Sequence, residues 1–480
     1  MILRLTDSQA LEAARHIAAT LRTAGHDAYF AGGCVRDLLL DLAPKDFDVA
    51  TSATPPEIIA LFPRTQPVGA HFGVILVQHE VDGQDIATEV ATFRHDGAYL
   101  DGRRPDAVRF TTDPREDVQR RDFTINGMLL DPAKITSQDG WPILDAQSHR
   151  AAGWVPEVDD SAVLDFVGGR EDLARKVVRT IDSPELRFTE DKLRMLRGVR
   201  FAARFGFTID PDTLEAMQRL APDIAQVSCE RVRDELTRML TGGHAQRAFE
   251  LLDLSGLLAQ VLPEITRMHG VEQPPEFHPE GDVFVHTMLL LAELPPGASP
   301  TLAWGMLLHD VGKPATFQPP NPAKPGDRIR FNGHVEVGVR IAEEILRRLR
   351  FSSDDTAQIV ALVRHHMQFG DVDLMKQSTL KRFLRLPKFE EHLALHRADC
   401  MSSHADLGLY EYAKSAYETT KPDVVRPALY VTGRDLIAAG YKPGPRFKAM
   451  LEAAEDAQLE GRIASTEEGL SLIARDFGAA

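Results

Sequence analysis

The chain has 480 residues, of which 43% are hydrophobic and 26% are charged, and its formal net charge is −16. These values predict a soluble globular protein of three or four domains, and no apolar run approaches the length of a membrane span. The negative charge argues against a nucleic-acid partner, but it is a weak test because phosphates interact with local basic clusters.

The N-terminal segment and the cysteines give two further expectations. The segment has early acidic residues and helical apolar spacing, which predicts a first helix and no signal peptide. Cys34, Cys229 and Cys400 lie far apart and show no metal-ligand spacing. Three such cysteines argue against a disulfide framework and favour a reducing environment, so we expect a cytoplasmic protein.

Residues 29–51 combine two features of phosphate chemistry. An extended segment ends in Gly32-Gly33, where the absent Cβ atoms allow the backbone to approach a phosphate, and a short helix begins beside it. Asp46 and Asp48 are predicted to lie on one face of the next strand, where two neighbouring carboxylates suit Mg²⁺. Either feature alone is usually structural, but together they indicate metal-assisted phosphoryl or nucleotidyl transfer.

A hairpin and a loop are predicted next. Residues 72–77 and 86–90 have the pattern of two strands joined through Asp82-Gly83. Glu89 on the second strand is a candidate third carboxylate, and a solvated strand residue is the alternative. Residues 92–110 are rich in Gly, Arg and Asp and lack periodicity, which predicts a mobile loop.

A further structured segment begins at Arg120. The pair Arg120-Arg121, with Asp122 and Asn126 after it, suits contacts to a triphosphate and a ribose, and a surface ion-pair cluster is the alternative. Residues 132–163 are polar, contain several Pro and Gly and have weak periodicity, so they are predicted to be an insertion or an extended hairpin.

The sequence becomes strongly helical after residue 163. Residues 187–201 are predicted to form one helix with a threonine cap and an apolar face. Asp191 and Arg194 would share a face of that helix and could offer an acceptor and donors to the edge of a base, and an ordinary ion pair is the alternative. Arg197 belongs to a basic stripe on the same helix, and residues 229–236 predict another amphipathic helix.

Four motifs in this order, GGCVRD, DFDVAT, RRDFTINGM and RFTEDKLRMLRGVRFAARFGF, resemble those of the bacterial class II tRNA nucleotidyltransferases and their poly(A) polymerase relatives. The resemblance covers roughly residues 25–250 apart from 132–163. It implies a polymerase β-like head in which Asp46 and Asp48 hold catalytic Mg²⁺. It also implies nucleotide binding by three sets of residues. These are Gly32, Gly33 and Arg36 for the triphosphate, Arg121, Asp122 and Asn126 for phosphate and ribose, and Glu190, Asp191 and Arg194, with Arg197 beside them, for the base.

The resemblance also bears on which nucleotides are added. Residues 101–105, DGRRP, resemble the flexible loop found in members of the family that add the terminal A.

After about residue 250 the chain is predicted to be helical and to carry a second set of ligands. The pattern resembles that of the HD phosphohydrolase superfamily, and it consists of His286, His309, Asp310 and Asp399. A single histidine is more often structural than a ligand, but four ordered ligands, together with the Gly-Lys-Pro that comes after His309-Asp310, favour a metal. Nitrogen and oxygen ligands suit Mn²⁺, Ni²⁺, Fe²⁺ or Mg²⁺, and His334 and the pair His365-His366 add enough ligands for a second ion.

Two basic segments lie in the C-terminal part. Five Lys and Arg residues between 376 and 388 form either an RNA contact or a solvated face. Pro443-Gly444-Pro445 precedes a predicted helix and resembles a segment of the family's tail, where a helix N-terminus and basic side chains meet phosphate.

The sequence therefore predicts an α+β head with a short mixed sheet, followed by an all-α neck, HD body and tail. The expected boundaries are 1–163 for the head, 164–250 for the neck, 251–410 for the HD domain and 411–480 for the tail.

The expected function is the addition of CCA to the 3′ end of tRNA from CTP and ATP, with a possible phosphohydrolase activity in the HD domain and no membrane partner. The alternatives are an A-adding enzyme or poly(A) polymerase, and an HD hydrolase whose head only binds RNA. The oligomeric state is left open.

Overall fold

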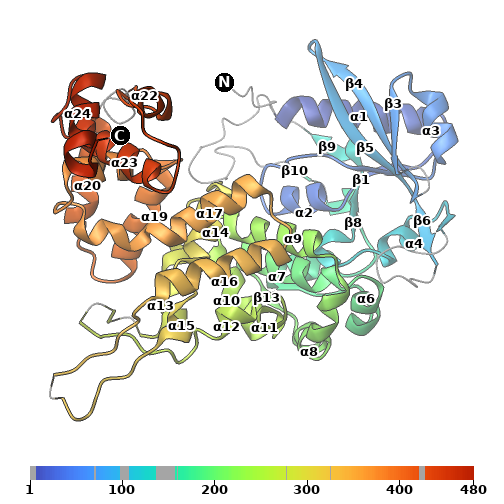
Figure 1. Cartoon of the computed structure of the whole chain (residues 1–480). Helices are drawn as coiled ribbons and strands as arrows, with labels where there is room; N and C mark the ends of the chain where they lie inside the picture. The colour runs from blue at the N-terminus through green and yellow to red at the C-terminus, as the bar shows by residue number, and fades with distance from the viewer. Residues whose placement is uncertain are drawn as a thin grey trace. The chain divides into compact units, whose positions relative to one another are not determined.

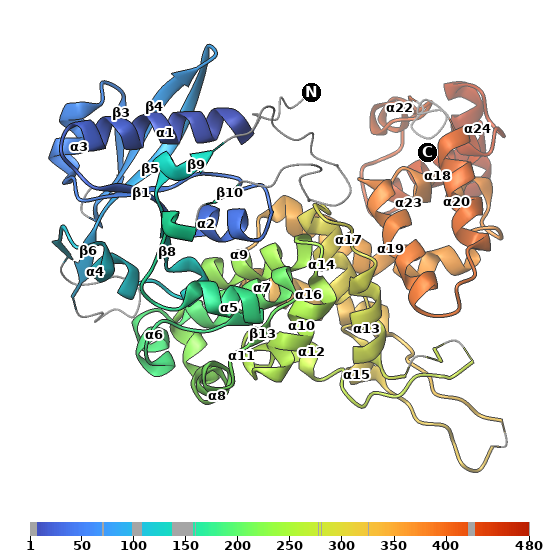
Figure 2. The ribbon, with the colours of Figure 1, turned by 180° about the vertical axis from the view of Figure 1, so that it is seen from behind.

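The computed structural model describes residues 7–69, 72–97, 108–136, 157–158, 160–276, 278–279, 281–324, 326–420 and 428–479 (Figures 1 and 2). The chain forms two compact units, one of residues 1–239 and 247–261 and the other of residues 240–246 and 262–480. The first contains a sheet with helices and the second is built from helices, so the predicted α+β class is confirmed. In the described part of the chain, no helix is both long and apolar enough to cross a membrane.

A mixed sheet of seven strands organises the first unit, in the order β11-β8-β1-β2-β5-β4-β3 (Figure 1). The β2–β5 pair is parallel and the other neighbouring pairs are antiparallel. Helix α1 (Asp7–Thr23) packs against β1, β4 and β5. The strands are β1 (Ala28–Ala31), β2 (Val49–Thr51), β3 (Thr65–Gly69), β4 (Val74–Val81), β5 (Gln84–Thr92), β8 (Met128–Leu130) and β11 (Val163–Asp165).

Local sequence signals set several of these elements. The hairpin predicted through Asp82-Gly83 is confirmed, because β4 and β5 pair from Val74↔Ala91 to Val81↔Gln84. Both turn residues have positive φ, 49° and 76°, as two-residue hairpin turns require. Helix α3 (Pro55–Leu61) begins with a capping box between Thr54 and Glu57.

The prediction that Asp46 and Asp48 lie on a strand is wrong by a few residues. Strand β2 begins at Val49, and its pairing with β1 ends at Phe30↔Val49. The backbone N of Ala31 still donates to the carbonyl of Asp48 at 3.1 Å, but Gly32 has φ +74° and the strand pairing does not continue past it. The two aspartates lie instead in the segment that leads into β2.

The predicted loop over residues 92–110 is also partly wrong. Strand β5 continues to Thr92, and β6 (Arg94–Asp96) pairs antiparallel with β7 (Val108–Phe110). Phe93 is fully buried between β5 and β6, which anchors this part of the chain. Residues 101–105, which resemble the flexible loop of family members that add the terminal A, lie outside the described residues.

The predicted insertion at 132–163 is described only at its ends. Strand β9 (Ile135–Thr136) pairs antiparallel with β10 (Glu157–Val158), and a short helix, η4 (Asp160–Ala162), leads into β11. The pairing agrees with an extended hairpin, and residues 137–156 lie outside the described part of the chain.

The single helix predicted over residues 187–201 is two helices. The first, α6 (Pro184–Glu190), ends at Glu190, and the second, α7 (Leu193–Phe205), begins at Leu193. Asp191 between them is extended, with φ −146° and ψ 105°. Its carboxylate accepts a hydrogen bond from Leu193 N at 3.1 Å, and this competition of a short acidic side chain with the helix explains the break.

Further short elements complete the first unit, and the predicted helix at 229–236 is confirmed as part of α9. They are α2 (Gly33–Leu39), α4 (Pro114–Gln119), η2 (Thr124–Asn126), η3 (Pro132–Lys134), α5 (Gly169–Arg175), β12 (Val177–Val178), β13 (Thr208–Ile209), α8 (Pro211–Leu220), η5 (Ala221–Gln226), α9 (Cys229–Thr241), α10 (Ala245–Leu254) and α11 (Leu257–Val261).

The second unit is a helical array with two described hydrophobic clusters. One is centred on Phe369 and Phe389, and the other on Leu436 and Ile473. The helices are α12 (Pro263–Thr266), α13 (Val283–Ala292), α14 (Pro300–Leu308), α15 (Lys313–Thr316), α16 (His334–Arg348), α17 (Ser353–His365), η6 (His366–Asp371), α18 (Gln377–Leu384), α19 (Phe389–Ser402), α20 (Gly408–Thr419), α22 (Gly433–Ala438), α23 (Arg446–Leu459) and α24 (Thr466–Phe477).

The basic run at 376–388 holds two of these helices together. Arg382 and Arg385 of α18 both pair with Glu455 of α23, at 2.8 and 2.6 Å, and Lys381 donates to the carbonyl of Leu459. These cations are therefore engaged in packing within the second unit, which accounts for them without an RNA contact.

Candidate functional sites

The two head aspartates lie at the end of β1, beside the glycine turn. The ring of Phe47, between them, packs against Phe30 with ring centroids 5.3 Å apart, which turns both aspartates away from the core. Burial, together with the charges of Asp46 and Glu89, raises the pKa of Asp48 to about 7, and Arg121 opposes this shift. A carboxylate that is costly to ionise beside other carboxylates is a place where a cation is stabilised.

Glu89, for which the sequence left open a ligand role or a solvated position, is exposed on β5 and its charge raises the pKa of Asp48. Among the described residues, however, the groups of three closely spaced ligands both lie in the second unit. The head therefore offers a pair of aspartates for a metal, with Glu89 as an electrostatic neighbour.

The glycine turn leaves room for a guanidinium. Gly32 has φ +74°, and a Cβ atom there would lie 2.9 Å from Nη1 of Arg121. Arg121 is held from the other side by Asp117, whose Oδ2 lies 3.0 Å from Nη2. The buried carboxylate of Asp117 also pairs with Arg120 at 2.6 Å. The turn and Arg121 thus place backbone N–H groups and a cation together, which suits a phosphate.

Arg36 does not lie at the open side of this turn. It is 4% exposed, and it donates to Oδ1 of Asp37 at 2.8 and 2.6 Å and to Oδ1 of Asn126 at 2.5 Å. Its guanidinium also lies against the rings of Phe201 and Phe205, 5.2 and 4.7 Å from their centroids. The structure places Arg36 inside a packed network, so a direct contact to a triphosphate requires several of these bonds to break.

Asp122, Asn126 and Arg197 belong to the same network. Asp122 accepts from the backbone N of Phe123 at 2.8 Å, from Asn126 Nδ2 at 3.0 Å and from Arg197 Nε at 2.8 Å. Burial raises the pKa of Asp122, but Arg197 and Asn126 outweigh it and bring the pKa down to about 2. Asp122 is therefore a fixed anion that orients Asn126 and Arg197.

The predicted base-reading residues cluster around the break between α6 and α7. Glu190 accepts from Arg194 at 2.6 Å and from Arg187 at 3.0 Å. Arg194 also donates to the backbone carbonyl of Arg120 at 3.0 Å. Asp191 is bound by Arg231 of α9, with Nη2 of the arginine 2.7 Å from Oδ2. Sequence reasoning missed Arg231, because no local spacing connects α9 to this break.

The second unit contains two groups of metal-capable ligands. One consists of His286, His309 and Asp399, and the other of Asp310, His334 and His366, and within each group the ligand atoms lie within 4.8 Å of one another. The four predicted HD residues are thus brought together, and His334 and His366 form a second group as their positions suggested.

Asp310 lies between the two groups. Its Oδ2 is 3.1 Å from His309 Nε2, and its Oδ1 is 3.8 Å from His334 Nε2 and 3.7 Å from His366 Nε2. Burial opposes its ionisation, but His309 and Lys313 hold the pKa of Asp310 well below its usual range. Lys313 contributes an ammonium 2.6 Å from Oδ2.

Three of the histidines are oriented by backbone carbonyls. The Nδ1 atoms of His309, His334 and His366 lie 2.8, 2.9 and 2.7 Å from carbonyl oxygens of Met306, Phe331 and Val363. Since a carbonyl only accepts, each Nδ1 carries a proton, and each Nε2 is left to face the other ligands. This is the usual way in which proteins prepare histidine ligands, and the nitrogen and oxygen donors fit a divalent metal.

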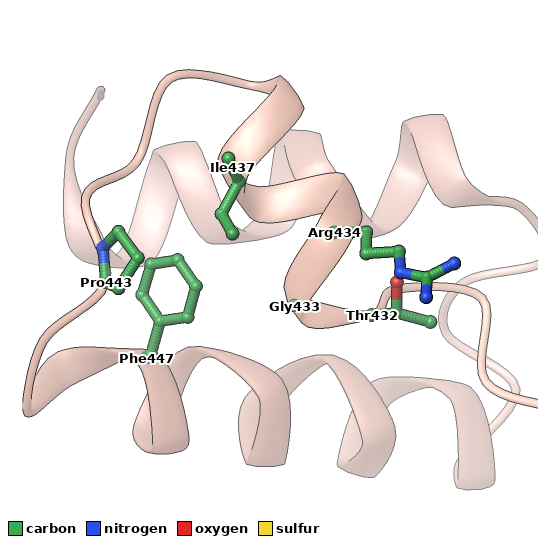
Figure 3. A pocket seen from close by; sticks show the side chains of 6 residues that line it. All are labelled: Thr432, Gly433, Arg434, Ile437, Pro443 and Phe447. Atoms are coloured by element: carbon green, nitrogen blue, oxygen red, sulfur yellow. The ribbon is translucent and has the colours of Figure 1, made fainter.

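The tail contains a shallow pocket of about 640 Å³ (Figure 3). Ile437, Pro443 and Phe447 form its apolar side, and Arg434 extends beside Thr432 at the other end. Helix α23 begins directly after Pro443-Gly444-Pro445, as predicted.

Comparison with known proteins gives consistent matches. The model of the "Poly A polymerase head domain" matches residues 28–147, that of the "Probable RNA and SrmB- binding site of polymerase A" matches 206–268, and that of the "HD domain" matches 283–402. A CCA-adding enzyme of Levilactobacillus brevis is 30% identical over 97% of this chain and 98% of its own length.

A CCA-adding enzyme of Oceanobacillus iheyensis is 41% identical over a match that covers 50% of this chain. The match spans about half of that relative, 52% of the relative's length. The crystal structure of the Bacillus stearothermophilus CCA-adding enzyme in complex with CTP matches with a TM-score of 0.69 and 28% identity, over 98% of each chain.

The arrangement of the HD ligands predicts their metal content. We expect the protein, loaded with Mn²⁺ or Fe²⁺ and freed of excess ion, to bind up to two ions per chain. His366→Ala should leave one ion, and Asp310→Ala, which removes the carboxylate between the groups, should weaken both by about 10–100-fold. Elemental analysis measures this, with the exposed His404→Ala as control. Equal metal content in all four proteins would contradict the two-group assignment.

Proposed function

The chain belongs to the family of CCA-adding enzymes, and on this premise we propose that it adds C and A residues to the 3′ end of tRNA from CTP and ATP, releasing pyrophosphate. The observation that carries the proposal is the position of Asp46 and Asp48 beside the Gly32 turn and Arg121, because it combines a cation site with a phosphate site. The reaction of an RNA 3′-hydroxyl with a nucleoside triphosphate needs the cation site and the phosphate site at the same place.

In this mechanism each group of the head has one task. Asp46 and Asp48 would hold Mg²⁺, which would supply a lower pKa for the 3′-hydroxyl and stabilisation of the leaving pyrophosphate. The Gly32 turn and Arg121 bind the triphosphate. Arg36 and Asp122 have an indirect role, because their buried hydrogen bonds hold Asn126 and helix α7 against the turn.

Base selection is assigned to Asp191 and Arg194. The exocyclic amino groups of cytosine and adenine donate hydrogen bonds and their ring nitrogens accept them, which matches a carboxylate and a guanidinium. Glu190 holds Arg194 in place. Protein side chains thus take the role that a nucleic-acid template has in other polymerases.

The partners and domains follow from the same proposal. The neck carries the segment that matches an RNA-binding family model, and the tail pocket combines apolar walls with Arg434, which suits a nucleotide of tRNA. We assign residues 1–163 to the head, 164–250 to the neck, 251–410 to the HD domain and 411–480 to the tail.

Two rivals are less well supported. An A-adding enzyme or poly(A) polymerase shares the head motifs, but the relative that matches over its full length is a CCA-adding enzyme. A hydrolase with a merely RNA-binding head has no use for two neighbouring carboxylates at Asp46 and Asp48, of which Asp48 is costly to ionise.

A second activity is favoured by one observation, the two oriented ligand groups around Asp310. We propose that the HD domain hydrolyses phosphoesters at damaged 3′ ends before nucleotides are added. A divalent ion held by these ligands supplies activation of water. Addition of water to a 2′,3′-cyclic phosphate breaks one P–O bond, and the released ribose oxygen takes the proton.

The first test of this function is removal of the head carboxylates. Asp46→Ala and Asp48→Ala should each abolish nucleotide addition to tRNA transcripts ending before CCA, after C or after CC, because neither carboxylate alone holds the metal. Asp85→Asn, an exposed carboxylate on β5, is the control. Substantial remaining addition by either alanine variant would contradict the assignment.

A second test concerns base choice. Asp191→Asn or Arg194→Gln should lower the preference for CTP and ATP over UTP and GTP by about tenfold or more, because each change removes a charged hydrogen-bonding partner. The ratios of kcat/KM for the four nucleotides measure this. An equal loss with all four, at unchanged preference, would support a structural ion pair instead.

The third test separates the two activities. Metal-dependent hydrolysis of a 2′,3′-cyclic phosphate should survive Asp46→Ala and disappear in His309→Ala and Asp310→Ala. Nucleotide addition should show the opposite pattern. Wild-type protein that hydrolyses no phosphoester with Mn²⁺, Ni²⁺, Fe²⁺ or Mg²⁺ would show that the ligands have no hydrolytic role.

A further inference from the structure

Asp191, which reads the base in the proposed function, is held by a residue from a distant part of the chain. Its Oδ1 accepts from Leu193 N at 3.1 Å, and its Oδ2 accepts from Nη2 of Arg231 at 2.7 Å. The side chains are 16% and 23% exposed, so water screens this ion pair less than it screens a surface pair. Two donors from different elements thus fix the carboxylate in the break between α6 and α7.

The chemistry of the four bases makes this fixation consequential. Cytosine and adenine carry an exocyclic amino group where uracil and guanine carry a carbonyl oxygen. An ionised carboxylate only accepts, so it binds the amino group and repels the carbonyl. A carboxylate that is free to rotate can turn its acceptor oxygen away from the amino group, and the discrimination is then weakened.

We propose that Arg231 is a positioning residue for base selection: it holds Asp191 as an oriented acceptor, so that bases with an amino group at the position where uracil and guanine carry a carbonyl are chosen. The inference rests on the proposed function, because it assigns the same site a further determinant of specificity. Arg231 itself acts through Asp191 and makes no contact with the reacting atoms.

Helix α9 does not depend on Arg231 for its position. Glu235, on the same helix and 1% exposed, pairs with Arg200 of α7 at 2.6 Å. Arg238, one turn further, also pairs with Glu235, at 2.7 Å, and its side chain is 61% exposed. Loss of the Arg231 bond therefore leaves the α7–α9 anchor intact, and Arg238 offers a matched control on the same helix.

The test compares Arg231→Gln, Arg231→Lys and Arg238→Gln in the full-length protein. For each, kcat/KM is measured for CTP, UTP, ATP and GTP with tRNA transcripts, and equilibrium binding of the four nucleotides is measured without tRNA. Arg231→Gln should lower the CTP/UTP and ATP/GTP preferences by about tenfold or more, as expected for the loss of a hydrogen bond between charged groups. Arg231→Lys should restore much of the preference, and Arg238→Gln should keep all of it. Thermal unfolding should be similar for all three.

The outcomes separate this inference from the proposed function. Unchanged preference in Arg231→Gln, or an equal loss with all four nucleotides, would overturn the role of Arg231. If the wild type transfers no nucleotide but binds CTP and ATP selectively, the proposed reaction fails, and the binding preferences of the variants still decide the inference. If the wild type binds all four equally, both fail.

Discussion

A buried charge needs a partner, because removing an ion from water costs several kcal/mol that only another charge or several hydrogen bonds can offset. This constraint organises the first unit. Arg36 is paired with Asp37, Asp122 with Arg197, and Asp117 with two arginines. These pairs join the turn after β1 to helix α7 and to the segment around Arg121. A nucleotide that enters the site meets side chains that these ion pairs have already oriented. It can bind only to the donors and lone pairs that the ion pairs do not use.

The same constraint acts at the HD ligands, with a different result. Asp310 is buried and Asp399 is partly buried, and both carboxylates lie 3.1 Å from a histidine Nε2 atom. Lys313 is a further cation placed against Asp310. Carboxylate oxygens and imidazole nitrogens thus converge in two groups, which makes this arrangement better suited to metal binding than to stability alone.

The sequence predicted the fold class, the hairpin at Asp82-Gly83 and the gathering of the HD ligands, since these depend on local turn chemistry and on ordered motifs. It failed where long-range contacts decide. Nothing local shows that Arg36 packs against two phenylalanines from α7, or that Arg382 and Arg385 of the basic run at 376–388 pair with Glu455. Helical periodicity also predicted one helix across Asp191, because the spacing of apolar residues does not show that the Asp191 side chain bonds to the start of the next helix.

The break at Asp191 has a consequence for how base and phosphate recognition are connected. Arg194, just beyond the break, donates to the carbonyl of Arg120 at 3.0 Å, and Arg187, before it, donates to the carbonyl of Gln119 at 2.9 Å. Both carbonyls belong to the chain that leads directly into Arg121. If Asp191 and Arg194 read the base as we propose, a shift of these residues would be passed to the cation at the glycine turn, and a base that fits poorly would also misplace the triphosphate. The base-reading and triphosphate-binding residues are thus connected through one stretch of backbone. Discrimination between bases can therefore appear in the rate of transfer as well as in binding. A single continuous helix carrying both Asp191 and Arg194 would not provide this connection.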